Sequence, residues 1–138
     1  MDIPSICVVL GFLTVFLPKW TVFKAAQRLP EGYNHREPRA QQATIPIGPG
    51  ARAVAAHLNG FEAFAPFAAS VILAKLAGAS DAQGFEVACV TFVVARVFYS
   101  AAYVAGFGNV RTFWWGVGFV ATLFNFGLAS FPSLWLAA

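Results

Sequence analysis

The chain has 138 residues, of which 59% are hydrophobic, 16% aromatic and 11% charged, and its formal net charge is +3. A soluble domain carries about 25% charged residues because its surface faces water, so this composition excludes an ordinary soluble domain. The mean hydropathy of +0.67 and the long apolar runs indicate an all-α integral membrane protein. The net charge is too small and too dispersed to predict nucleic-acid binding.

The first apolar segment covers residues 3 to about 26 and is long enough to cross a bilayer as a helix. Pro18 lies inside this segment and predicts a kink, because proline cannot donate the backbone hydrogen bond of a helix. No basic stretch precedes the segment and no small-residue cleavage site follows it, so we expect a retained span rather than a signal peptide.

Three further apolar segments follow, at about residues 51–77, 85–107 and 112–136. Each can supply the ~20 residues that a spanning helix needs. A polar loop rich in proline and glycine, at about residues 27–50, separates the first two segments. The sequence therefore predicts one domain, residues 1–138, that forms a transmembrane four-helix bundle.

Basic residues concentrate on one side of this predicted topology. The first loop and its flanks hold Lys19, Lys24, Arg28, Arg36, Arg39 and Arg52, and the third loop holds Arg111. The second loop has no basic residue, although Lys75 lies close to it and can extend toward the interface. By the positive-inside rule, we expect the first and third loops in the cytoplasm and both termini outside it. In a bacterium, this membrane would be the inner membrane.

Polar residues interrupt the second apolar segment on one helical face. Arg52 and Asn59 are seven residues apart and Glu62 follows Asn59 by three, so a helix places all three along one stripe. His57 points to nearly the opposite side. A charge at the centre of a membrane helix costs roughly 2.5–3.5 kcal/mol, so we expect Glu62 to face protein or a water-filled cavity.

The third apolar segment carries a matching stripe. Tyr99 and Tyr103 follow Arg96 at spacings of three and seven, and Arg111 comes just after the segment ends. Carboxylate, amide, phenol and guanidinium groups at one depth suit a polar, anionic small molecule that enters from the cytoplasm. The alternatives are that Glu62 and Arg96 pair only to fasten the helices, and that both tyrosines are interfacial anchors.

Other residues are expected to have packing roles. His57 fits interfacial or inter-subunit packing better than catalysis. Cys7 and Cys89 lack partners at ligand spacing, so the sequence predicts neither a metal site nor a disulfide framework. The last apolar segment contains aromatic residues that we expect to face lipid or pack against other helices, namely Trp114, Trp115, Phe119, Phe124 and Phe126.

Two motifs resemble those of the MAPEG superfamily, the membrane-associated proteins in eicosanoid and glutathione metabolism. They are Asn59-x-x-Glu62-x-x-x-Pro66-Phe67 in the second segment and Ala95-Arg96-x-x-Tyr99-x-x-x-Tyr103 in the third. The loop phrase that runs from Asn34 to Arg39 is similar to loops of bacterial members. The layout and length agree as well, so the resemblance covers nearly the whole chain.

The resemblance implies a four-helix fold that assembles as a homotrimer, with glutathione bound between subunits near the cytoplasmic side. Asn59 and Glu62 would hold the polar end of glutathione, Tyr99 and Tyr103 would contact its peptide part, and Arg111 would favour its thiolate. Arg52 and Arg96 complete the expected binding residues. Glutathione would be a cosubstrate, an apolar electrophile dissolved in the bilayer would be the second substrate, and no metal is needed.

The sequence departs from the family pattern at two positions. Many family enzymes have an arginine four residues before the asparagine, where this chain has Ala55, although Arg52 lies one turn earlier. Some members have a tyrosine after the glutamate, where this chain has Ala63. The alternative function is therefore a non-catalytic accessory subunit of a larger membrane assembly. A four-helix exporter fits less well, because the first segment has no carboxylate after Asp2.

Overall fold

The computed structural model describes residues 1–131, and these residues form helices joined by short connections. The elements are α1 (Ile3–Thr14), α2 (Lys19–Gln27), α3 (Pro38–Ala43), α4 (Pro49–Leu76), the 3-10 turn η1 (Ala79–Asp81), α5 (Phe85–Ala105) and α6 (Gly108–Ser130). No strand occurs within residues 1–131, which confirms the all-α prediction.

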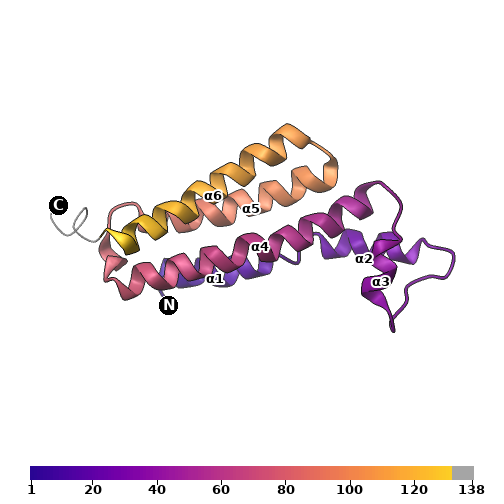
Figure 1. Ribbon diagram of the computed structural model, residues 1–138, viewed down its shortest axis with the longest axis horizontal. Coiled ribbons are helices and arrows are strands. Elements are labelled where there is room, and N and C mark those ends of the chain that lie inside the picture. The colour runs from indigo at the N-terminus through magenta and orange to yellow at the C-terminus, as the bar shows by residue number, and fades with distance from the viewer. Residues whose placement is uncertain (132–138) are drawn as a thin grey trace.

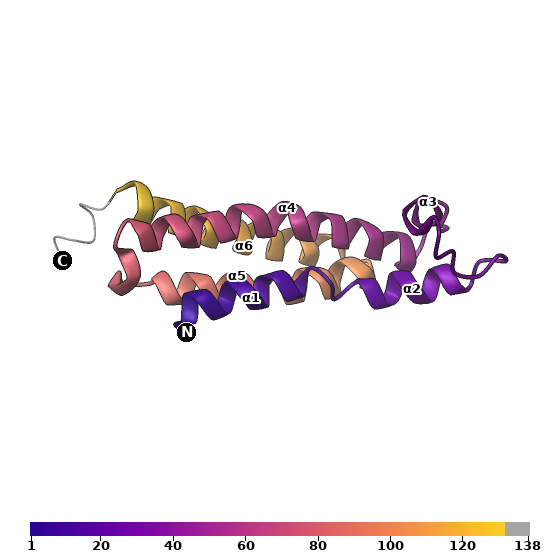
Figure 2. The same ribbon diagram turned by 90° about the horizontal axis from the view of Figure 1, so that it is seen from below.

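The long helices run side by side along one axis (Figures 1 and 2). α1 and α2 follow each other nearly in line, and α4 lies beside both of them. α5 packs most extensively against α6 and also contacts α1 and α4. α1 begins and α6 ends at one end of the molecule, whereas α3 and its flanking loops lie at the other (Figure 1).

Three stretches within the described residues are long and apolar enough to cross a membrane, namely Ile3–Gln27, Phe85–Ala105 and Gly108–Ser130. α4 has 28 residues but is not among them. Its length is sufficient, and the difference is its composition, since Arg52, His57, Asn59 and Glu62 all lie in its first half. The prediction of four apolar spans is therefore supported for three helices, and the fourth is distinguished by its polar residues.

The first span is broken in the middle, as Pro18 predicted. α1 ends at Thr14 and α2 begins at Lys19, whose N–H donates to the carbonyl of Phe16 instead of that of Val15. His57 Nδ1 lies 2.8 Å from the Val15 oxygen. Because a carbonyl only accepts, His57 Nδ1 must carry a proton and donate it to the oxygen that the break leaves free.

The segment 27–50 differs from the simple polar loop that we expected, because it contains α3. Pro38 stands at the start of this helix, where its missing N–H costs nothing. The Gln41 side chain then fastens the helix to the preceding loop: its Nε2 donates to the Gly32 carbonyl, and its Oε1 accepts from the Asn34 N–H at 2.9 Å. The predicted end of the last span, near residue 136, lies outside the described residues.

The main core lies between α1, α4, α5 and α6. At its centre, the rings of Phe67 and Phe92 stack with centroids 3.7 Å apart. Cys7 and Cys89 are buried free thiols, in agreement with the packing role that we expected. Beside Cys89 lies Asn125, which is fully buried and whose Nδ2 is 3.7 Å from the sulfur, while its Oδ1 has no partner. No group of metal-ligating residues occurs in the described part of the chain.

Candidate functional site

The two polar stripes predicted on the second and third segments meet between α4 and α5. Arg96 Nη2 donates to Asn59 Oδ1 at 3.2 Å, and Asn59 Nδ2 donates to Glu62 Oε2 at 3.0 Å. Arg96 is buried, with 3% of its surface exposed, whereas Glu62 is exposed. Asn59 therefore connects a buried cation to an exposed carboxylate, and the structure contains no direct ion pair between Arg96 and Glu62.

The polar contacts continue along α5 toward the start of α6. The Arg96 guanidinium carbon lies 4.1 Å from the centre of the Tyr99 ring, and the Tyr99 and Tyr103 rings meet edge to face at 5.5 Å. Arg111, in the first turn of α6, lies 4.6 Å from the centre of the Tyr103 ring. We call this continuous set the polar track: Glu62, Asn59, Arg96, Tyr99, Tyr103 and Arg111.

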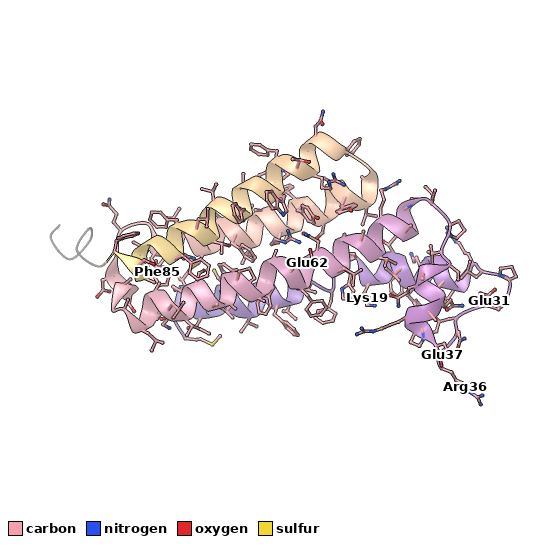
Figure 3. All side chains as sticks on the ribbon, viewed as in Figure 1. Lys19, Glu31, Arg36, Glu37, Glu62 and Phe85 are labelled. Carbon is pink, nitrogen blue, oxygen red and sulfur yellow. The ribbon has the colours of Figure 1, made fainter. Side chains whose placement is uncertain are left out.

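The polar track begins deep within the helical layer. Glu62 lies 13 residues after Pro49, the first residue of α4, which is about 20 Å along a helix axis. Figure 3 shows Glu62 near the middle of the long axis, far from the loop carboxylates Glu31 and Glu37. An exposed carboxylate at this depth is unfavourable in lipid. It therefore needs water, another polypeptide or a polar ligand beside it.

Arg52, the remaining residue predicted to bind glutathione, contacts a different part of the protein. Its Nε donates to the Val104 carbonyl at 3.0 Å, near the end of α5. Gly106 follows with φ of 90°, and a Cβ at this position would lie 3.3 Å from the Arg52 guanidinium carbon. The glycine thus allows both the turn and the close approach. Arg52 fastens the start of α4 to the end of α5 and forms no hydrogen bond with the residues of the polar track.

His57 lies apart from these groups, as its helical position indicated. It is 8% exposed, bonds to the Val15 carbonyl and contacts the rings of Phe16 and Phe61. Within the chain, His57 therefore packs the break in the first span against α4.

A pocket opens where the polar track faces α6, with a volume of about 280 Å³. We call it the α4–α6 pocket. One wall is polar and consists of Asn59, Glu62 and Arg96. The rest is largely apolar and consists of Ala63, Pro66, Phe92, Trp115, Gly118, Phe119, Thr122 and Phe126. The rings of Trp115 and Phe119 stack at 5.2 Å. Sequence reasoning assigned these α6 aromatics only to lipid contact and packing, although three of them line the pocket.

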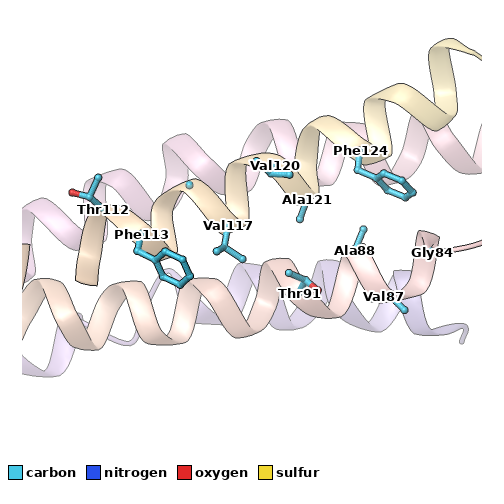
Figure 4. Close-up of a pocket in the computed structure, with 11 residues that line it drawn as sticks. Gly84, Val87, Ala88, Thr91, Thr112, Phe113, Val117, Val120, Ala121 and Phe124 are labelled. Atoms are coloured by element: carbon cyan, nitrogen blue, oxygen red, sulfur yellow. The ribbon is translucent and has the colours of Figure 1, made fainter. Parts of the chain in front are cut away.

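A larger hollow of about 760 Å³ lies between α5 and α6 and is almost entirely apolar (Figure 4). Its walls include Val87, Thr91, Phe113, Val117 and Phe124. No residue of the polar track lines it. It offers no ionisable group for chemistry, and its composition matches that of a surface in contact with acyl chains or another apolar helix.

Comparison with known proteins supports the resemblance noted in the sequence. Searches of curated proteins and of solved structures found no significant match. A family model described as the MAPEG family matches residues 3–131, a range that contains every residue of the polar track. With three apolar helices of spanning length, this match identifies an integral membrane protein of the glutathione and eicosanoid metabolism kind. The chain belongs to the MAPEG family.

Proposed function

We propose that the protein is a glutathione-dependent membrane transferase or peroxidase that acts on apolar electrophiles dissolved in the bilayer. The observation that carries this proposal is the polar track beside an aromatic-lined pocket. Polar groups at this depth are costly in lipid, so a binding role accounts for their presence better than packing alone. Family membership supports the same reading.

The dimensions of the track suit a tripeptide. Arg96 and Tyr103 are seven residues apart on α5, about 10 Å along its axis. An extended tripeptide also spans about 10 Å. Glutathione carries an ammonium group, two carboxylates and a thiol. Asn59 and Glu62 would hold its polar end, where the Glu62 carboxylate complements the ammonium, and Arg96 would complement a carboxylate.

Tyr99 and Tyr103 would contact the peptide part, and Arg111 would then lie near the thiol. A neighbouring cation lowers the pKa of a thiol and so increases the fraction of thiolate, which is the nucleophile. In conjugation, the thiolate sulfur bonds to the electrophilic carbon, the leaving group departs with the bonding electrons, and the thiol proton goes to water. In peroxide reduction, two glutathione molecules convert a hydroperoxide to an alcohol and water and become the disulfide.

The second substrate would lie along α6. Trp115 and Phe119 follow Arg111 by four and eight residues, so they continue one helical face from the guanidinium into the apolar layer. The stacked Trp115 and Phe119 rings would hold an apolar molecule next to the thiolate. A lipid-soluble electrophile could reach this face sideways from the bilayer, while glutathione enters from the loop end.

We infer that the active form is the homotrimer that the family resemblance implies, because the site within one chain is open and small. Glu62 is exposed in the single chain, and the 280 Å³ of the α4–α6 pocket lie just below the usual 300–1,000 Å³ of ligand sites. A second four-helix subunit against α4 would cover Glu62 and enlarge the site. We place the loop 27–50 in the cytoplasm and both termini outside it, because the basic residues gather at that end.

The experiment is a glutathione titration of the purified protein in detergent, which follows thermal stabilisation and thiolate absorbance separately. We expect the wild type to show both signals and Arg111→Ala to keep binding but lose most of the thiolate. The control is Arg36→Ala, since Arg36 is an exposed loop arginine far from the track (Figure 3). The proposal would be excluded if glutathione neither raised the unfolding temperature of the wild-type protein nor produced thiolate absorbance.

A specific contact also favours a second function, that of a non-catalytic accessory subunit. Ala55 replaces the family arginine, and Arg52, the nearest substitute, uses its Nε to fasten α4 to the Val104 carbonyl. On this reading the polar track only holds helices together. A stoichiometric partner that co-purifies in mild detergent, without glutathione-dependent stabilisation, would favour this function over the first.

A further inference from the structure

A second polar pocket lies at the loop end of the molecule, outside the polar track. It has a volume of about 390 Å³ and is formed by α2 together with the segment that leads from α3 into α4. Its lining includes two cations, Lys24 and Arg28, and the backbone and side chains of residues 45–50. We call it the basic pocket. The proposed glutathione site uses none of its residues.

No carboxylate of the described residues forms an ion pair with the cations of the basic pocket. Within residues 1–131 the one ion pair is Lys75 with Asp2, at the other end of the long helices. The nearby loop carboxylates, Glu31 and Glu37, form no ion pair with Lys24 or Arg28. Lys24 and Arg28 are both exposed. Two uncompensated positive charges in one pocket favour an anionic ligand.

Apolar side chains surround this charged pocket, and within residues 1–131 they are left exposed. Ile47 lines it and is 102% exposed, and Trp20 lines it and is 64% exposed. The Lys24 ammonium lies 5.0 Å from the centre of the Trp20 ring, so cation and aromatic ring form one surface. A free inorganic anion would use only the charges. A ligand with an anionic head and apolar tails would use both kinds of group.

The position of the pocket in the fold gives the source of such a ligand. Lys24 and Arg28 lie in and just after the last turn of Ile3–Gln27, a helical stretch of spanning length, so they stand at its interfacial end. Tryptophan is enriched at this level of a membrane protein, and basic clusters there bind anionic lipids. Exposed Leu13 and Leu17 continue the apolar surface from Trp20 along the same stretch toward the bilayer centre.

We propose that the basic pocket binds the headgroup of an anionic phospholipid. Lys24 and Arg28 contact the phosphate, and Trp20 and Ile47 contact the first segments of the acyl chains. The lipid fixes α2 against the start of α4 and sets the depth at which this end of the protein lies in the membrane.

The test measures binding of phosphatidylglycerol to the purified full chain in neutral detergent, by native mass spectrometry and by the shift in unfolding temperature. The variant is Lys24→Gln/Arg28→Gln. The matched control is Arg36→Gln/Arg39→Gln, which removes the same charge from residues that do not line the pocket. We expect the pocket variant to bind roughly tenfold more weakly or worse, since each basic residue near an anionic lipid contributes measurably. The control should bind as the wild type does.

Further arms of the test separate the possible sources of the phosphate. Phosphatidylcholine should bind much more weakly than phosphatidylglycerol, and inorganic phosphate at the same concentration should not displace the lipid. Ile47→Ser should weaken lipid binding without changing the unfolding temperature of the lipid-free protein. Equal losses in the pocket variant and the control, equal binding of both lipids, or displacement by inorganic phosphate would each overturn the proposal. None of these outcomes depends on glutathione binding.

Discussion

Asn59 offers the sharpest test of the polar track, because it alone connects the buried Arg96 to Glu62. Asn59→Ala removes the acceptor 3.2 Å from the Arg96 guanidinium and the donor 3.0 Å from the Glu62 carboxylate. Arg96 keeps its contact with the Tyr99 ring but loses its hydrogen-bond partner on α4. The substitution therefore leaves a buried charge less well satisfied.

The size of the effect follows from these contacts. A hydrogen bond to a buried charged group contributes about 1.5–3 kcal/mol, and the second bond, to an exposed carboxylate, contributes about 0.5–1 kcal/mol. Alanine recovers up to ~0.7 kcal/mol because it is the better helix former. We expect Asn59→Ala to lower the free energy of unfolding by about 1.3–4 kcal/mol.

The assay is a denaturant titration in mixed micelles that includes Arg96→Met and the double variant. Asn109→Ala is the control, because Asn109 is exposed and makes no side-chain hydrogen bond in the described part of the chain. It should change the free energy of unfolding by less than about 0.5 kcal/mol. A coupling energy near zero between Asn59 and Arg96, or equal losses in Asn59→Ala and Asn109→Ala, would refute this reasoning.

Three further predictions concern other parts of the fold. The buried Asn125 Oδ1 has no partner, so Asn125→Leu should raise the free energy of unfolding by about 1–3 kcal/mol in the same titration. A loss of stability would contradict this prediction. A Cβ on Gly50 would lie 2.5 Å from the Ala25 Cβ, so Gly50→Ala should destabilise α2 against α4 by about 1–3 kcal/mol, while Gly127→Ala, with open space around it, should not destabilise. Lys75 lowers the pKa of Asp2 through a 2.7 Å bond, so this ion pair stabilises the fold at neutral pH and loses its contribution as the pH falls below about 4. The pH dependence of thermal unfolding should weaken in Asp2→Asn in that window, and identical profiles would contradict the assignment.

Much of the fold could be predicted from the sequence, because hydropathy and helical spacing are local properties. Pro18 indicated the break in the first span, and the spacing of Asn59 and Glu62 indicated that they share a face. α3 escaped prediction because its fastening depends on Gln41, whose side chain reaches Gly32 and Asn34 across a loop. The six residues of α3 are too few to show a periodic pattern, and no such pattern predicts a side-chain contact across a loop.

The candidate site divides in the same way. The polar residues were evident because they are rare in apolar segments, but their partners depend on how the helices rotate against one another. The last carbonyls of α5 lack helical partners, and Arg52 bonds to one of them, that of Val104. Only the packed structure reveals this choice of partner. In the sequence, Trp115 and Phe119 cannot be distinguished from aromatic residues that face lipid. Only the position of α6 shows that they line the α4–α6 pocket.

The bond between His57 and Val15 has a consequence for how the protein enters the membrane. The first span emerges from the ribosome before α4 does, and until α4 lies beside it the Val15 carbonyl lacks the partner that His57 provides. An unsatisfied carbonyl in the hydrocarbon layer costs several kcal/mol. The first span therefore has an unpaired carbonyl until α4 packs beside it. Its stable insertion depends on α4, which is itself too polar to be among the three apolar spans.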